Sequence, residues 1–342
     1  MEIADRVSGC FFGLAIGDAF AARTEFISSV EQIYLKYPPD GPHDLEGSPS
    51  RVTDDTQMTL AVARALLNAP RPFSPAGLEM TLRHEFVKWL LDPENNRAPG
   101  LTCLDACQNL KKGLIWQQAT VAHSKGCGAN MRVAPVGWMP AGKFGIDSSS
   151  RAAIAQFQAA LTHGHPTGLA ASDLTAATIT YLLEGGKPAE LVSWLKEYSH
   201  SQRLVYHTDW LGSLWDRSTF SNPQNYIAKG WDDCLGVLSR LEKALLRQDY
   251  KTDPCQQTGA GWIAEEALAT ALLCFLLYPD DAVSAIRRAA ITSGDSDSIA
   301  CLTGAFAGAY LGAKAFPQNW LDRIEYRETI LELSEGFTKL FA

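Results

Sequence analysis

Apolar residues recur at spacings of three and four along most of the chain, and strict alternation of apolar and polar residues is scarce. This spacing gathers apolar side chains on one face of an α-helix, whereas alternation would indicate a half-buried strand. The pattern therefore predicts an all-α protein. The predicted helices cover residues 3–22, 54–67, 75–91, 150–161, 173–183, 188–198, 231–246, 262–277, 281–290, 298–315 and 317–340, the last with a break.

Two of these predicted helices, 54–67 and 298–315, are unusually rich in small residues. Alanines cluster over 61–65, and glycine and alanine fill most positions over 304–309. Small residues let helix backbones approach closely, and a helix that is apolar on nearly every side belongs inside a multi-helix core. We expect both helices near the centre, with their N-termini where the bundle opens to solvent.

An acidic cluster begins each of these two helices. The first reads Thr53-Asp54-Asp55-Thr56, and the second reads Asp295-Ser296-Asp297-Ser298. Neighbouring carboxylates repel by about 4 kcal/mol when they lie about 4 Å apart near a protein surface, and oxygen-rich clusters suit hard divalent cations. Helix capping is the ordinary alternative, because Thr, Ser and Asp are favoured N-caps. Capping explains one acid per helix but does not require a second.

The composition is that of a soluble globular enzyme rather than of a nucleic-acid-binding or membrane protein. The 342 residues are 46% hydrophobic and 20% charged, with a formal net charge of −8. A net negative charge offers no general attraction to phosphate backbones or anionic lipids. The longest apolar run, 267–278, is too short to cross a bilayer, and the N-terminus lacks a basic signal-like start. We expect a cytoplasmic protein with no nucleic-acid or membrane partner.

The chain is expected to form a single compact domain over 1–342, because no segment has a convincing linker composition. The segment 199–258 is the least regular and could be an elaboration over one face of the site. The eight cysteines are scattered, and the one close pair, Cys103 and Cys107, has helical spacing without a second pair to complete a zinc site. Buried thiols are the favoured interpretation.

Five segments in this order resemble the signatures of the ADP-ribosylglycohydrolase family, whose founding member reactivates dinitrogenase reductase. They are 9–19 (GCFFGLAIGDA, followed by Glu25-Phe26), 53–58 (TDDTQM), 124–135 (SKGCGANMRVAP), 162–163 (TH) and 294–300 (GDSDSIA). Any one segment alone is a weak signal, but their order and spacing together are specific. The resemblance covers nearly the whole chain and implies an all-helical bundle with two divalent cations, Mg²⁺ or Mn²⁺, at its mouth.

The resemblance implies a set of metal ligands from both acidic clusters, which periodicity alone could not bring together. Four carboxylates in one site need about two divalent ions for charge balance. Ser293, Ser296 and Ser298 replace the usual Gly and two Thr of the last signature, and Ser298 retains a hydroxyl that can ligate. The implied ligands are Thr53, Asp54, Asp55, Asp295, Asp297 and Ser298.

The reaction implied by the resemblance is hydrolysis of the bond between the terminal ribose C1 of ADP-ribose and a modified protein side chain, with arginine favoured. The transition state resembles an oxocarbenium ion, so an acid or base must manage water and leaving group. Glu25 is the candidate carboxylate at the reacting ribose or water, and Asp54 and Asp297 are expected to be essential. A solvated acid after a helix is the ordinary interpretation of Glu25. Asp18 is expected to be a buried hydrogen-bonding acid that supports the site.

Substrate contacts are expected chiefly from the glycine-containing third signature. Glycine-rich backbone suits a diphosphate, although most glycine pairs simply mark turns. Each of three residues has an ordinary alternative role. His163 could instead be a packed or capping residue, Arg132 a structural ion-pair partner, and Trp262 a core aromatic. The expected substrate-binding residues are Ser124, Gly126, Cys127, Gly128, Met131, Arg132, His163 and Trp262.

A second hypothesis belongs to a different class. The chain could bind ADP-ribose, or block an ADP-ribosyltransferase toxin as an immunity protein, with or without hydrolysis. Glu25 and four aspartates favour catalysis, because a pure blocker has no need of them. The protein partner is expected to be an ADP-ribosylated protein, and a toxin is the alternative partner.

Overall fold

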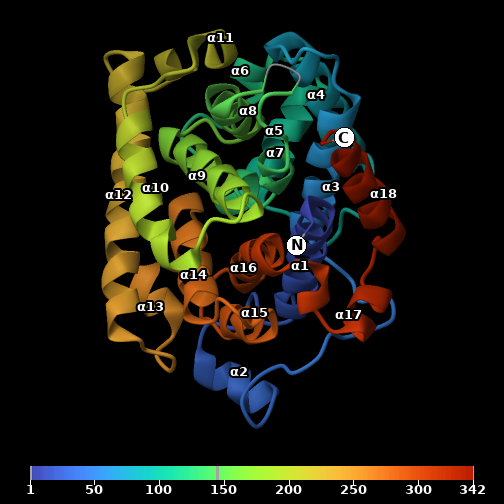
Figure 1. Ribbon diagram of the computed structural model, residues 1–342. Coiled ribbons are helices and arrows are strands. Elements are labelled where there is room, and N and C mark those ends of the chain that lie inside the picture. Colours follow the sequence, from blue (N-terminus) through green and yellow to red (C-terminus); the bar gives the residue numbers. More distant parts are fainter. Residues whose placement is uncertain (1, 144–145, 342) are drawn as a thin grey trace.

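The computed structural model describes residues 2–143 and 146–341, so residues 1, 144, 145 and 342 of the expected domain lie outside the described part. In this described part the regular elements are helices (Figure 1). A few isolated β-bridges occur between loops there, but no strand. The all-α prediction is confirmed. The α-helices are α1 (Ile3–Ala21), α2 (Val30–Lys36), α3 (Asp54–Asn68), α4 (Pro75–Leu91), α5 (Leu101–Lys111), α6 (Trp116–Ala119), α7 (Ala134–Gly137), α8 (Ser148–Ala160), α9 (Pro166–Leu183), α10 (Pro188–Gln202), α11 (Thr208–Leu211), α12 (Pro223–Arg247), α13 (Pro254–Thr258), α14 (Ala264–Leu277), α15 (Ala282–Ala290), α16 (Ser296–Leu311), α17 (Gln318–Arg323) and α18 (Arg327–Lys339). Three 3-10 turns are η1 (Cys127–Ala129), η2 (Leu214–Arg217) and η3 (Ala313–Ala315).

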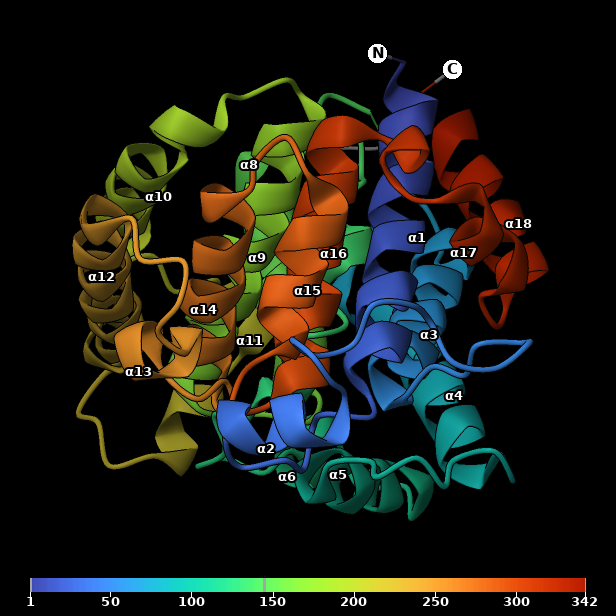
Figure 2. The same ribbon diagram turned by 90° about the horizontal axis from the view of Figure 1, so that it is seen from below.

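The centre of the fold is the antiparallel pair α1 and α16, which lie side by side in Figures 1 and 2. Their backbones approach so closely that a Cβ on Gly13 would lie 2.1 Å from the carbonyl oxygen of Gly304, and one on Gly304 would lie 1.9 Å from that of Gly13. Gly9 and Gly308 are paired in the same way one turn along. Only glycine fits such contacts. The pairing brings the N-terminus of α16 beside the C-terminal end of α1.

The other helices extend this centre into a packed row. Figure 2 shows α12, α14, α16 and α1 following one another across the molecule, with α3 and α18 beyond α1. Each of these neighbours packs on the next, and α9 lies against α8, α12, α14 and α16. The small-residue helix 54–67, now α3, is buried over most of its length, as the sequence predicted. The row leaves the N-termini of α3 and α16 at one end of the α1–α16 pair.

The sequence placed most helices correctly but began two of them too late. The structure starts α9 at Pro166 rather than at 173, and α12 at Pro223 rather than at 231. Both begin with proline at the first helical position, after a residue whose side chain caps the helix, His165 or Asn222. In α12 the polar residues at 224 and 225 follow this proline and interrupt the apolar period. The predicted break within 317–340 is confirmed between α17 and α18.

Several short helices escaped the sequence pattern, among them α2 and α5. Cys103 and Cys107 lie on α5, where both thiols are free and buried, as expected. Over the described residues, a helix with the length and apolar character needed to cross a membrane is not found.

Candidate active site

The two acidic clusters meet at the N-termini of α3 and α16. Asp54 and Asp55 form the first turn of α3, Asp297 lies in the first turn of α16, and Asp295 precedes that helix. All four aspartates are buried. A carboxylate oxygen from each of Glu25, Asp295 and Asp297 lies within 4.8 Å of the others. The close α1–α16 pairing, which no local pattern reveals, is what brings these distant segments together.

The charges of this cluster oppose one another. Burial, followed by repulsion from Asp297, raises the pKa of Asp54 and of Asp55 well above the ordinary value for aspartate. The pKa of Asp295 is raised for the same two reasons. In the described part of the chain, Oδ2 of Asp55 is buried and has no hydrogen-bond partner. Crowded, desolvated oxygen donors with an unpartnered lone pair fit hard divalent cations.

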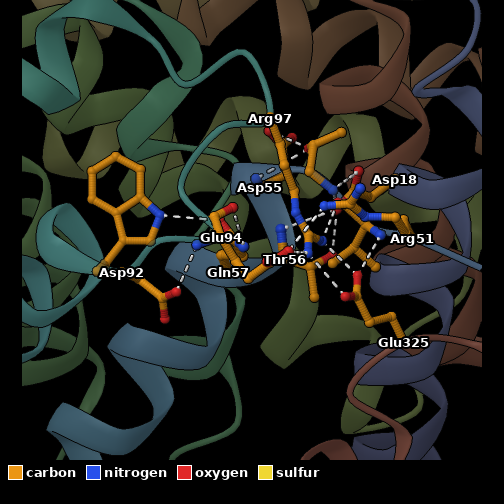
Figure 3. A network of polar contacts seen from close by, with 12 residues as sticks. Asp18, Arg51, Asp55, Thr56, Gln57, Asp92, Glu94, Arg97 and Glu325 are labelled. Atoms are coloured by element: carbon orange, nitrogen blue, oxygen red, sulfur yellow. Dashed lines mark hydrogen bonds and ion pairs between the residues drawn. The ribbon is translucent and has the colours of Figure 1, made fainter. Parts of the chain in front are cut away.

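Asp18 contrasts with this cluster, because its carboxylate is fully engaged. It accepts hydrogen bonds from the backbone N–H of Thr53 at 3.0 Å and of Thr56 at 3.1 Å, and from the Thr56 hydroxyl (Figure 3). Asp18 thereby caps α3 from α1 and fixes where the first acidic cluster begins. Burial, then repulsion from Asp297, raises its pKa to about 7. The supporting role expected for Asp18 is confirmed by these bonds.

Glu25 lies on the segment that follows α1, held against α16. The hydroxyl of Thr24 lies 3.0 Å from that of Ser296, and Arg23 pairs with Glu46 at 2.6 Å on the outer side. Glu25 is half-buried, and burial, followed by the charges of Asp297 and Asp54, raises its pKa to about 9. The Arg23–Glu46 ion pair therefore ties this segment to the loop that carries Glu46.

A cavity of about 530 Å³ opens above the acidic cluster. Twelve of the site residues expected from the sequence line this cavity, together with Phe26 and the segment 98–103. Thr53, Ser124 and Arg132 do not reach its lining. The twelve are Glu25, Asp54, Asp55, Gly126, Cys127, Gly128, Met131, His163, Trp262, Asp295, Asp297 and Ser298.

The three that lie outside the lining have other positions. Thr53 is the N-cap of α3, and its hydroxyl accepts from the backbone N–H of Asp55 at 3.3 Å. Ser124 lies beside the cavity, with its hydroxyl 2.9 Å from that of Thr102. Arg132 is fully buried behind the wall and bonds to neutral partners. Among the described residues it therefore takes neither the lining position nor the ion pair considered from the sequence.

The glycine-containing segment 124–128 is anchored to the start of α14. The N–H of Cys127 donates to the carbonyl of Trp262 at 3.1 Å, and the N–H of Ala264 donates to that of Lys125 at 2.9 Å. The ammonium of Lys125 also pairs with the buried carboxylate of Glu265. These bonds hold Gly126, Cys127 and Gly128 in the wall of the cavity.

Two parts of the lining escaped the sequence analysis. Phe26 is 70% exposed and its ring is stacked with that of Trp262, which is 48% exposed, at a centroid distance of 6.4 Å. An apolar ring directly after Glu25 was the available signal. The segment 98–103 precedes and enters α5, and a proline- and glycine-containing stretch carries no periodic signal from which its position could be read.

The segment 98–103 owes its place to an ion-pair network beside Asp18 (Figure 3). Arg97 contacts both oxygens of Glu325 at 2.5 and 2.9 Å, and it donates to the carbonyl of Val52 at 2.7 Å. Glu325 in turn accepts from the N–H of Val52 at 3.0 Å. The same two side chains thus hold the cavity wall after Arg97 and the residue that precedes the first acidic cluster.

None of the lining residues of this cavity falls within 199–258, as far as the described residues go. The segment instead comprises the end of α10 and the elements α11, η2, α12 and α13. The hydroxyl of Tyr226 on α12 bonds to the carbonyl of Gly164. Its role as an elaboration over the site stays a prediction.

Comparisons with known proteins agree with this geometry. A model of the ADP-ribosylglycohydrolase family matches residues 1–342. The chain is 28% identical over 345 residues to ADP-ribosylarginine hydrolase Tri1 of Serratia proteamaculans, covering 98% of this chain and 79% of that protein. It is 26% identical to mouse ADP-ribosylhydrolase ARH3, covering 98% and 92%.

The chain is also 24% identical to the ADP-ribosyl-[dinitrogen reductase] glycohydrolase of Rhodospirillum rubrum, covering 95% of this chain and 92% of that protein. A solved structure described as an ADP-ribosylglycohydrolase-related protein complex superposes with a TM-score of 0.67 at 22% identity, covering 100% of this chain and 99% of the other. This structural likeness shows the shared fold.

Proposed function

The chain belongs to the ADP-ribosylglycohydrolase family, and we propose that it hydrolyses the glycosidic bond between ADP-ribose and a modified protein side chain in the cavity above α3 and α16. The observation that carries the proposal is the composition of this cavity. At its acidic end the cavity gathers Glu25 with four buried aspartates, and Gly126, Cys127 and Gly128 form another part of its wall. A sugar diol suits the acidic end, and a diphosphate suits the glycine-containing backbone.

The acidic end fits two divalent cations, Mg²⁺ or Mn²⁺, with Thr53, Asp54, Asp55, Asp295, Asp297 and Ser298 as the proposed ligands. When bound, such ions supply positive charge that orients ribose hydroxyls and activates water. The unpartnered oxygen of Asp55 and the mutual repulsion of the aspartates support this assignment. Asp18 and the helix N-termini hold the donors in place.

Glu25 is proposed to contact the reacting ribose or the attacking water. Its carboxyl group lies beside Asp295 and Asp297 at the edge of the cavity, where positive charge would develop on the ribose ring in the transition state. Phe26 and Trp262 flank the same opening, and their rings would shield the bond from bulk water.

Arginine is the proposed linkage, because the relative Tri1 is named for ADP-ribosylarginine. A purely binding role is not favoured, since the relatives compared above are named as hydrolases and this chain has Glu25 and four aspartates in one cavity. A toxin partner therefore enters only as an outcome to be tested.

A linkage-resolved assay tests the proposal. Purified protein with Mg²⁺ or Mn²⁺ is expected to release ADP-ribose from an ADP-ribosyl-arginine peptide faster than from a matched ADP-ribosyl-serine peptide, with the products identified by mass spectrometry. Excess chelator should stop the release, and added metal should restore it. Equal turnover with chelator would rule out the metal assignment, and release from neither peptide would count against hydrolysis itself.

A further inference from the structure

A fully buried arginine, Arg132, lies behind the cavity wall and is held by uncharged groups. Its Nε donates to the side-chain oxygen of Gln158 at 3.0 Å, and its Nη2 donates to the Gln158 carbonyl at 3.0 Å and to the hydroxyl of Thr162 at 2.8 Å. The ring of Phe86 lies 4.4 Å from the guanidinium carbon of Arg132. A buried charge is costly unless its hydrogen bonds are satisfied, so these contacts fix the guanidinium in one orientation.

Thr162 connects this guanidinium to His163. Its Oγ1 lies 2.8 Å from Nδ1 of His163, and it can also donate to the carbonyl oxygen of Ala159 at 3.4 Å. The hydroxyl carries one hydrogen, and Arg132 already donates to one of its lone pairs. The nearer acceptor for that hydrogen is Nδ1. A ring nitrogen that accepts carries no proton, so the hydrogen of a neutral imidazole must then lie on Nε2.

The opposite edge of the imidazole faces the cavity. His163 lines the cavity, and a Cβ added at Gly126 would lie 3.4 Å from Nε2. One added at Gly128 would lie 3.1 Å from Cε1 of the same ring. The two glycines therefore leave room for this ring edge within the wall. Burial, and next the charge of Arg132, lowers the pKa of His163 to about 3, which keeps the ring neutral near pH 7.

We propose that Arg132 and Thr162 are positioning residues that fix His163 with its hydrogen on Nε2, so that the ring offers a neutral donor to an anionic group of the ligand. The identity of that anion rests on the proposed function, under which the diphosphate of ADP-ribose lies against the segment 124–128. The other tautomer would turn a lone pair toward the phosphate oxygens. Arg132 thus acts on the ligand through two side chains and without touching it.

The tautomer can be read directly in wild-type protein without ligand. Long-range ¹⁵N–¹H NMR of histidine-labelled protein, with His163→Gln to assign the signals, should show a protonated Nε2 and a bare Nδ1 from about pH 5 to about pH 8. His84, whose side chain is 74% exposed, provides a solvent-exposed imidazole for comparison. A bare Nε2 on His163 would overturn the proposal, whatever ligand the protein binds.

Two substitutions test the connection through Thr162. Thr162→Val removes the hydroxyl at similar volume, and Thr162→Ser retains it. The valine variant should show both tautomers and bind ADP-ribose about tenfold more weakly by calorimetry, since one hydrogen bond to a charged group is lost. Its KM should rise while kcat changes little, and the serine variant should match wild type. A valine variant that keeps the hydrogen of His163 on Nε2 alone would contradict the positioning of His163 through Thr162.

These measurements separate the positioning of His163 by Arg132 and Thr162 from the proposed function. If the valine variant does not fold, the wild-type spectrum alone still decides the tautomer. A protonated Nε2 together with no ADP-ribose binding by the wild type would support the positioning of His163 and count against the proposed function.

Discussion

Two groups of buried aspartates behave in opposite ways. Asp173, in the middle of α9, is surrounded by donors from neighbouring helices, with Gln156 on α8 at 2.9 Å and the hydroxyl of Tyr198 on α10 at 2.8 Å. The aspartates at the N-termini of α3 and α16 instead face one another, and Asp55 has a buried oxygen without a partner among the described residues. The fold supplies donors to Asp173 and leaves one oxygen of Asp55 without a donor in the described part of the chain.

Side-chain hydrogen-bond donors from neighbouring helices distinguish the structural Asp173 from the clustered aspartates, whereas burial does not. Burial raises the pKa of Asp173 to about 6, and it also leads the causes that raise the pKa of Asp54 and of Asp55. For Asp173 the hydrogen bonds from Gln156 and Tyr198 oppose this shift, whereas for Asp55 the neighbouring carboxylates add to it. A bound cation would lower the pKa of Asp54 and Asp55, reversing the direction of their shift, and would leave the pKa of Asp173 unchanged.

The largest expected contrast is in catalysis. Asp297→Asn should lower kcat/KM by at least about a thousandfold, because several kcal/mol of transition-state stabilisation depend on the charge held at this site. Asp173→Asn should stay within about twofold of wild type, because its carboxylate lies outside the cavity lining. Steady-state hydrolysis of an ADP-ribosyl-arginine peptide measures both. Comparable losses in the two variants would erase the distinction.

Metal should stabilise the protein through one group only. At a metal concentration about a hundred times the dissociation constant, binding to the folded state adds about 2.7 kcal/mol. Thermal unfolding of the chelated wild type should therefore shift upward on adding Mg²⁺ or Mn²⁺. The double variant Asp54→Asn/Asp297→Asn should not shift, whereas Asp280→Asn, at an exposed acid, should respond like wild type. A shift that survives in the double variant would place the metal elsewhere.

In the sequence, Asp173 and the aspartates of the acidic clusters look alike, because each stands near the start of a predicted helix. This likeness explains which helix starts could be predicted. The apolar period predicted helices starting at 54, 298 and 173, and the first two starts are nearly right. The start at 173 is wrong because α9 begins at Pro166 after the cap His165, and Asp173 lies in mid-helix, where Gln156 and Tyr198 donate to its carboxylate. Local pattern registers a cap but carries no information on a distant donor.

The candidate site shows the same limit. Periodicity predicted the helices that carry the aspartates, but their convergence came only from the resemblance to a family. The glycine contacts between α1 and α16 supply the physical reason. Phe26, the segment 98–103 and the Arg97–Glu325 pair that holds it were missed, because tertiary contacts set the positions of these irregular segments.

Removing the scaffold acid should affect stability rather than chemistry. Asp173→Ala leaves the amide of Gln156 and the hydroxyl of Tyr198 without their buried acceptor, and each unsatisfied group costs about 1–3 kcal/mol. Denaturant unfolding at saturating metal should report a loss of this order, while kcat per folded molecule is retained. A stability equal to that of wild type would mean that water replaces the carboxylate.

The smallest expected effect is a pH dependence that tells the two groups apart at saturating metal. Burial raises the pKa of Asp173 from 3.8 to about 6, so the folded state binds its proton more tightly than the unfolded state does. The stability due to this group is fully present below about pH 4 and is lost as the pH rises through about 6. The amide that replaces the carboxyl group in the Asp173→Asn variant cannot titrate, so the unfolding free energy of wild type relative to this variant should fall by about 1–2 kcal/mol between about pH 5 and about pH 7. A rise over that interval would mean that the bonds from Gln156 and Tyr198 outweigh burial, and the carboxylate of Asp173 would then be a satisfied anion in the neutral range.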